Sequence, residues 1–202
     1  MVVANQNPLS RLRRRIQRYG LLPSIRRFVS RACNRTFRAR LCVWVWRPGE
    51  PLADGPVEFP IRRYASAEQL PPAVLEELIA GDASSFESRM RQEFREGGAL
   101  WVAFAGGRAA GYHWSRNGRF VENWHFELNE NDVLIYSTVT FPEFAGRGIA
   151  RAVMARICRD EVPAHGRALA DCMVWNTPAV SFIAKTGFTK VAERKPLSHH
   201  PD

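Results

Sequence analysis

The sequence has only four cysteines, and their spacing matches no known disulfide or metal-binding pattern. There is no Cys-x-x-Cys pair and no Cys/His set with metal-ligand spacing among Cys33, Cys42, Cys158 and Cys172. This pattern disfavours a disulfide framework and a zinc site, so we expect a reducing compartment, the cytoplasm, and no metal. No run of 18 apolar residues occurs either, which argues against a membrane-spanning helix.

Acidic residues are missing from the first 49 positions, which hold twelve arginines. The chain as a whole has a formal charge of +9, but its other 153 residues carry 17 basic and 20 acidic side chains. The basic character therefore belongs to an N-terminal arm, residues 1–49, and the body is mildly acidic. A length of 202 residues with 46% hydrophobic residues suits one folded domain preceded by such an arm.

Two short amphipathic helices are predicted in this arm. In residues 8–19 apolar side chains recur at helical spacing between arginines, Gly20 ends the pattern, and a second helix begins at Pro23. Three interpretations stay open: a solvated extension, an anchor on an anionic membrane surface through residues 8–40, and nucleic-acid binding through phosphate contacts. No stacking or DNA-reading motif supports the third, so we favour the membrane over nucleic acid. The start also resembles an organelle transit peptide.

The arm ends in an apolar stretch, Arg-Leu-Cys-Val-Trp-Val-Trp, that favours a strand, and residues 50–56 are then expected to form a linker rich in Pro and Gly. The domain is expected to cover residues 57–202. Strands are predicted at 57–64, 99–117 (a hairpin turning at Gly106-Gly107), 132–141, 167–175 and 189–194. Helices are predicted at 66–80 (with a break at Pro71-Pro72), 84–98, 148–162 and 177–187. This order predicts an α/β fold, a mixed sheet with helices on both faces.

A strand runs into a glycine turn at residues 141–154, Phe-Pro-Glu-Phe-Ala-Gly-Arg-Gly-Ile-Ala-Arg-Ala-Val-Met, just where a helix begins. Gly146 and Gly148 let the backbone approach a ligand, and the first helical turn has unpaired N–H groups. Such a junction suits phosphate or pyrophosphate, with Arg147 or Arg151 adding a charged contact. A P-loop would need Gly-Lys-Ser/Thr, which is absent, and no doubly wound half surrounds the turn as a Rossmann fingerprint requires. A tight turn without a ligand is the alternative.

Residues 57–195 resemble the GNAT superfamily of acyl-CoA-dependent N-acyltransferases. The family motif Gln/Arg-x-x-Gly-x-Gly/Ala, after Pro-Asp/Glu-aromatic, is similar to residues 142–150, and the motif Asn-x-x-Ala-x-x-x-Tyr-x-x-x-Gly-Phe is similar to residues 176–188. The resemblance implies a GNAT-like, mostly antiparallel sheet and acetyl-CoA or another acyl-CoA as co-substrate. Two positions depart from the family pattern: Ala145 replaces the Gln/Arg, and Ile183 replaces the tyrosine that in many members protonates the departing thiolate.

The resemblance also implies the site residues. A primary amine, on a small molecule or a protein, would attack the thioester directly. The strand segment Thr138-Val139-Thr140 matches the family segment that pairs with the pantetheine arm, and a splay or bulge there would free an N–H for the carbonyl oxygen. The pyrophosphate would bind at Gly146, Arg147, Gly148, Ile149, Ala150 and Arg151.

Three further side chains are candidates. Asn176 matches a CoA contact, with a helix cap as the alternative. Asp171 is the candidate general base, with a solvated strand-end aspartate as the alternative, and Tyr136 is the candidate general acid. His113 is predicted to be a sheet residue and not a base. The competing function is a CoA-binding module that has lost turnover and is tethered by the basic arm, a reading that Ala145 and Ile183 favour.

Overall fold

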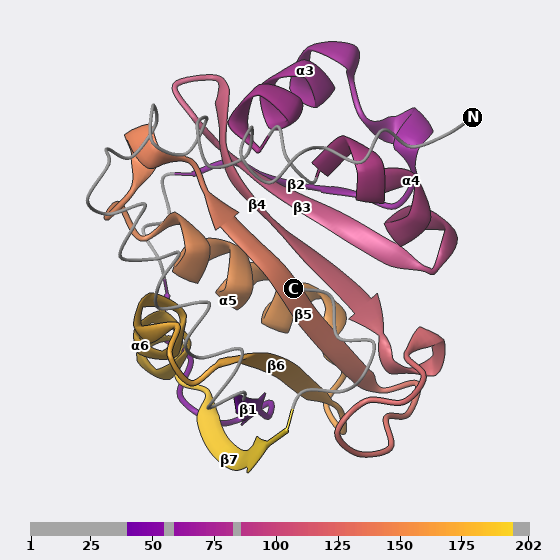
Figure 1. Ribbon diagram of the computed structural model, residues 1–202, viewed down its shortest axis with the longest axis vertical. Coiled ribbons are helices and arrows are strands. Elements are labelled where there is room, and N and C mark those ends of the chain that lie inside the picture. The colour runs from indigo at the N-terminus through magenta and orange to yellow at the C-terminus, as the bar shows by residue number, and fades with distance from the viewer. Residues whose placement is uncertain (1–39, 55–58, 83–85, 196–202) are drawn as a thin grey trace. The chain divides into compact units, whose positions relative to one another are not determined.

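A seven-stranded sheet organises the body of the protein (Figure 1). The computed structural model describes residues 40–54, 59–82 and 86–195. The strands are β1 (Leu41–Trp46), β2 (Ile61–Tyr64), β3 (Gly98–Ala105), β4 (Arg108–Asn117), β5 (Asp132–Thr140), β6 (Arg167–Met173) and β7 (Thr189–Arg194). Their order in the sheet is β2-β3-β4-β5-β6-β1-β7. Every neighbouring pair is antiparallel except β5 and β6, so the sheet is mixed and mostly antiparallel, as predicted.

Among the described residues, four α-helices accompany the sheet: α3 (Pro72–Gly81), α4 (Phe86–Arg95), α5 (Ile149–Glu161) and α6 (Thr177–Thr186). Three short 3-10 turns lie at Ala67–Gln69, Gly118–Phe120 and Pro142–Phe144. The proline pair acts as expected, because the first 3-10 turn ends before it and α3 begins at Pro72. Among the described helices, none combines the length and the apolar character needed to cross a membrane.

Helices lie on both faces of the sheet, as alternate side chains of β4 demonstrate. The Trp114 ring packs against Phe86 and Phe94 of α4, whereas the ring of its neighbour His113 packs against Phe182 of α6. Successive residues of a strand point to opposite faces, so α4 and α6 cover different faces. Figure 1 shows α3 and α4 together beside β2 to β4, and α5 alongside β5. We call the two faces of the sheet the α4 face and the α6 face, after the helices that cover them.

The first strand corrects the expected domain boundary. Leu41–Trp46 forms a strand, as predicted, but it lies inside the sheet between β6 and β7 and is buried along its whole length. The compact unit starts at Arg40, so the Pro/Gly-rich stretch after β1 lies within it and does not precede it. The predicted helices of residues 8–19 and from Pro23 lie outside the described residues.

Candidate active site

Strand β5 has two very different edges. On one side it pairs with β4 from Val133 to Thr140. On the other side, within the described chain, it pairs with β6 at three positions, Asp132 to Leu134, and the two parallel strands then separate. We call the side of β5 that faces β6 beyond Leu134 the open edge. Its backbone groups have no strand partner there, so the predicted splay is present.

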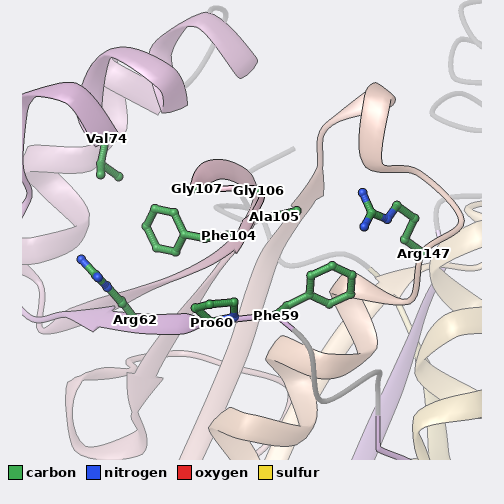
Figure 2. A pocket seen from close by; sticks show the side chains of 9 residues that line it. All are labelled: Phe59, Pro60, Arg62, Val74, Phe104, Ala105, Gly106, Gly107 and Arg147. Carbon is green, nitrogen blue, oxygen red and sulfur yellow. The ribbon is translucent and has the colours of Figure 1, made fainter.

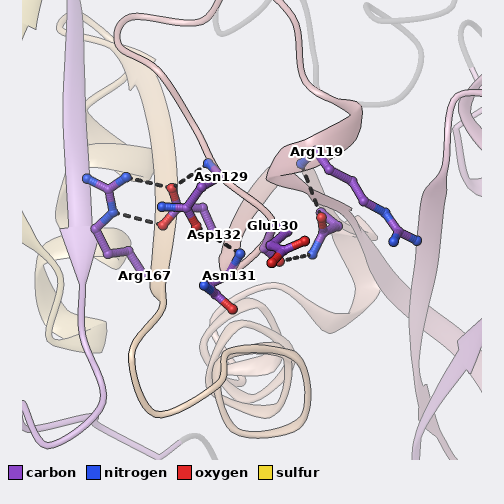
Figure 3. Close-up of polar contacts among 7 residues, drawn as sticks. Arg119, Asn129, Glu130, Asn131, Asp132 and Arg167 are labelled. Carbon is purple, nitrogen blue, oxygen red and sulfur yellow. Dashed lines mark hydrogen bonds and ion pairs between the residues drawn. The ribbon is translucent and has the colours of Figure 1, made fainter.

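A salt bridge closes the paired end of this junction (Figure 3). The Arg167 guanidinium donates from Nε to Asp132 Oδ1 at 2.8 Å and from Nη2 to Asp132 Oδ2 at 2.5 Å. The Asp132 carboxylate also accepts from the backbone N–H of Asn129 at 3.0 Å, and its side chain is 1% exposed. A buried carboxylate with several donors is well compensated, so this end of β5 and β6 is held together.

A β-bulge interrupts the other edge of β5. Trp114 is opposite Tyr136 and Tyr112 is opposite Val139, so Ser137 and Thr138 together oppose the single residue His113. Ser137 has φ 49°, a left-handed conformation that is uncommon outside glycine. The Thr138 hydroxyl lies 3.2 Å from His113 Nδ1 on the α6 face. The sequence predicted a splay or a bulge in this segment, and a bulge is present.

The bulge and the strand alternation decide which amides face the open edge. The Phe141 N–H donates to the Ala110 carbonyl on the β4 side at 2.9 Å. Because successive residues of a strand direct their backbone groups to opposite sides, Val139 also faces β4, whereas Thr138 and Thr140 face the open edge. Of the three residues predicted to meet the pantetheine arm, only Thr138 and Thr140 direct their N–H groups toward the open edge.

The start of α5 supplies further unpaired donors. Gly148 precedes the helix with φ 79°, and the first helical bond runs from the Ala152 N–H to the Gly148 carbonyl. Within the described chain the amides of residues 146–151, which we call the anion loop, have no hydrogen-bond partner. These donors lie at the positive end of the helix dipole, an arrangement that suits a phosphate or diphosphate group.

Two arginines accompany the anion loop. Arg147 is exposed, and its guanidinium lies over the rings of Phe59 and Phe144. The Arg151 Nε atom is buried and has no hydrogen-bond partner in the described chain. A buried guanidinium N–H without a partner is costly, and an anionic ligand would satisfy it.

Asn176 and Ile183 both belong to the motif at residues 176–188. Asn176 precedes α6 and its side chain caps no amide of that helix, so the capping alternative is wrong. The side chain is exposed. Ile183, in contrast, is 3% exposed and packs in the hydrophobic core. An alkyl side chain there can fill space but cannot donate a proton.

Asp171 is a buried partner of His125 and not a solvated strand-end residue. The His125 Nε2 atom lies 2.8 Å from Asp171 Oδ2, and the two side chains are 1% and 7% exposed. Asp171 lies two residues beyond Leu169, the last β6 residue paired with β5, so it borders the open edge. His125 comes from the segment between β4 and β5, which the sequence could not connect with Asp171.

Tyr136 belongs to a second buried polar group. Its hydroxyl donates to Glu93 Oε2 of α4 at 2.6 Å, and Arg116 Nη2 donates to the same oxygen at 2.7 Å. Burial, and then the charge of Glu93, raise the pKa of Tyr136 far above that of an ordinary tyrosine. The hydroxyl therefore stays protonated at neutral pH, which makes it a hydrogen-bond donor but a weak acid.

The two candidate catalytic side chains share one face of the sheet. Leu134 and Leu169 are paired and so point the same way, and Tyr136 and Asp171 each follow two residues later. Tyr136 is also opposite Trp114, which packs on α4, so both candidates lie on the α4 face. The open edge is thus flanked by Asp171 of β6, which is paired with His125, and by Tyr136 of β5.

The fully buried His113 lies on the opposite face. Burial lowers the pKa of His113 to about 3, so the ring is neutral at physiological pH. Its Nε2 atom has no hydrogen-bond partner in the part of the chain that the structure describes. A neutral ring 3.2 Å from Thr138 behaves as the predicted sheet residue, and its place opposite the bulge explains the register shift.

Comparison with known proteins places this geometry in context. Residues 67–188 match the acetyltransferase (GNAT) family. The fold is similar to a putative GNAT acetyltransferase from Novosphingobium aromaticivorans, with 15% identity, a TM-score of 0.53 and coverage of 77% of this chain and 61% of that one. It is also similar to a GNAT acetyltransferase from Colwellia psychrerythraea, with 15% identity, a TM-score of 0.55 and coverage of 78% and 54%.

A third similar structure is the aminoglycoside N-acetyltransferase AAC(6′)-Iy in complex with CoA, with 16% identity, a TM-score of 0.53 and coverage of 71% of this chain and 100% of that one. At these identities the likeness establishes the fold. The chain spans only 61% and 54% of the length of the two bacterial structures named above. A search of curated proteins finds no match.

Proposed function

Since the chain belongs to the acetyltransferase (GNAT) family, we propose that it is an N-acyltransferase that moves an acyl group, in the first instance acetyl, from acyl-CoA to a primary amine. The observation that carries this proposal is that two groups of unpaired donors, at the open edge of β5 and at the start of α5, lie close together along the chain. The open-edge amides of Thr138 and Thr140 lead into the anion loop within a few residues. This arrangement suits a ligand that has a diphosphate at one end and an amide-bearing arm at the other.

The backbone would do most of the binding. The anion loop would hold the diphosphate, with Arg147, Arg151 and the exposed Asn176 side chain adding contacts. The open-edge amides would hold the arm and donate to the thioester carbonyl oxygen, where negative charge develops as the amine attacks. Because amides supply these contacts, the loss of the family's Gln/Arg at Ala145 is compatible with CoA binding.

Asp171 is the proposed site of proton acceptance. The amine must lose a proton as its nitrogen bonds to the carbonyl carbon, and the Asp171–His125 pair lies at the open edge to receive it. Asp171 would act directly or through a water molecule. His125, held by Asp171, would keep the carboxylate in place.

Tyr136 is the proposed proton donor to the thiolate that leaves when the C–S bond breaks. Ile183 cannot fill this role, whereas the Tyr136 hydroxyl is a protonated group on β5, which borders the open edge. Its raised pKa makes it a slow donor. Water can share the task, because a thiol with a pKa of about 8.5 leaves readily as the thiolate.

Calorimetry with CoA, followed by thiol release from acetyl-CoA with a panel of amines, tests the proposal. The panel should include sugar amines, polyamines, amino acids and peptides with free N-termini. We expect saturable CoA binding and thiol release with at least one amine class. Absence of CoA binding would refute the proposal, whereas binding without release by any amine would favour the tethered CoA-binding module.

A further inference from the structure

A cavity of about 340 Å³ lies beside the anion loop and outside the open edge (Figure 2). This volume is within the range of about 300–1,000 Å³ that is common for small-molecule sites. Its lining comes from the β2 segment, α3, the β3–β4 hairpin turn and the anion loop: Phe59, Pro60, Arg62, Val74, Phe104, Ala105, Gly106, Gly107 and Arg147. We call it the arginine cavity.

Two guanidinium groups border the arginine cavity without an acidic partner in the described chain. Arg62 lies with its guanidinium 5.5 Å from the centre of the Phe104 ring, and Arg147 lies 5.3 Å from that of Phe59. Figure 2 shows the two arginines on opposite sides of the cavity, with both rings between them. Stacking on an aromatic ring orients a guanidinium while leaving its N–H groups for a ligand.

The surrounding acids are already engaged. Glu143 lies 3.5 Å from Arg108, and Glu77 accepts from the Ala109 N–H at 2.5 Å. The wall beneath the cavity is tied together by a bond from the Phe104 N–H to the Pro60 carbonyl at 2.9 Å. The cavity is therefore electropositive, which favours an anionic group.

We propose that the arginine cavity binds the phosphate monoester of a nucleotide, and that its source is the adenosine 3′-phosphate end of CoA. This inference rests on the proposed function. Arg147 belongs both to the anion loop and to the lining of the cavity, so a ligand whose diphosphate occupies the loop can direct its next phosphate into the cavity that Arg147 and Arg62 line.

The assignment concerns this chain in particular. Phe59, Pro60 and Arg62 precede residues 67–188, the part that matches the family. The hairpin turn contributes Gly106 and Gly107, both with positive φ, and a side-chain carbon added at either would meet no atom within 4 Å. These residues lie on the opposite side of β5 from the open edge, because β3 and β4 precede β5 in the sheet.

Calorimetry with CoA and with 3′-dephospho-CoA on the full chain tests the assignment. The unaltered protein should bind CoA about tenfold or more tightly than 3′-dephospho-CoA, because a phosphate held by two guanidinium groups is lost. Arg62→Gln should remove most of that preference and leave the affinity for 3′-dephospho-CoA unchanged. Arg119→Gln is the charge-matched control, since Arg119 lines a different cavity, and it should preserve the preference.

Each other outcome has a defined meaning. Equal affinities of the unaltered protein for CoA and 3′-dephospho-CoA would overturn the assignment while leaving the proposed acyltransferase function intact. Equal losses of both affinities in Arg62→Gln would also overturn it. Adenosine 3′,5′-bisphosphate that binds without competing with CoA would identify a separate nucleotide site and refute CoA as the source. Binding of neither coenzyme would refute the proposed function itself. Thermal melting of each variant reports whether it folds.

Discussion

The two edges of β5 belong to one strand but differ in how far they are hydrogen-bonded to a neighbouring strand. Toward β4, pairing continues to the end of the strand and a bulge is accommodated within it. Toward β6, pairing stops at Leu134, after a salt bridge at Asp132 has joined the strands. Both edges belong to a central strand, where hydrogen-bond groups are normally used by neighbours.

Under the proposed function, this difference would let the sheet hold a ligand without losing its stability. The β4 edge contributes hydrogen bonds to folding, and the open edge leaves its donors for another molecule. We therefore expect changes on the β4 edge to alter the free energy of unfolding. Changes beside the open edge should alter binding or turnover and leave stability less affected.

Asp171→Asn should produce the largest effect on turnover. General-base catalysis typically contributes a factor of about 10² to 10⁴, so we expect kcat to fall at least about 100-fold with CoA affinity preserved. Thiol-release kinetics with an amine identified from the panel provide the measurement. Asp160→Asn, at the far end of α5 in an ion pair with Arg156, is the matched control. A kcat within about threefold of the unaltered value would exclude Asp171 as the base.

Gly148→Val should weaken CoA binding about 100-fold, because a β-branched residue opposes φ 79° and distorts the anion loop. Calorimetry measures the affinity. Gly49→Val is the control, since Gly49 has φ 91° and open space around it. Both variants should lose about 1–3 kcal/mol of stability, but only the first should lose CoA. Unchanged CoA affinity in Gly148→Val would contradict the diphosphate site.

Gly111→Ala tests the β4 edge. The added carbon would lie 2.5 Å from the Val139 carbonyl oxygen and 3.1 Å from the Thr140 Cα, and backbone atoms cannot move aside cheaply. We expect the free energy of unfolding to fall by about 3 kcal/mol, as measured by urea denaturation. Stability equal to that of the unaltered protein would mean that the β4 edge is as permissive as the open one.

Acid should destabilise the protein through His113. The folded pKa is lowered to about 3, below the unfolded value of about 6.5, so the unfolded chain binds the extra proton. The contribution of His113 to the free energy of unfolding is fully present above pH 6.5 and is lost as the pH falls toward 3. Between pH 7 and 5 we expect a loss of about 2 kcal/mol in urea denaturation. His113→Gln should lack this component, and an equal slope in both proteins would contradict the assignment.

Ser137→Gly should have the smallest effect. Glycine accepts φ 49° without strain but costs more chain entropy on folding, so the two effects nearly cancel. A stabilisation of about 0.5 kcal/mol is expected in urea denaturation, with CoA affinity unchanged. A loss of more than about 1 kcal/mol would show that the Ser137 side chain, and not only the bulge, stabilises this segment.

Local patterns predicted the elements well because their causes are local. Pro72 begins α3, Gly106 and Gly107 turn the β3–β4 hairpin, and the glycine turn precedes α5. Partners distant in sequence were not predictable in this way. Leu41 is opposite Met173, and composition alone had assigned its strand to the basic arm because no acid precedes Glu50.

The same division holds for the candidate site. Motifs located the anion loop, Asn176 and the segment around Thr138, because each depends on a few consecutive residues. The contacts of Asp171 with His125 and of Tyr136 with Glu93 join residues 46 and 43 positions apart. No periodicity signals such pairs.

By itself, the sequence determined where strands, helices and turns form and that a helix begins on unpaired amides behind two glycines, since neighbouring residues control these features. Only the tertiary structure decided that β1 enters the sheet, that β5 and β6 separate after Leu134, and that Arg62 and Arg147 border one cavity. Those outcomes depend on which distant surfaces pack together, and burial and hydrogen bonding across the whole body choose among the possibilities.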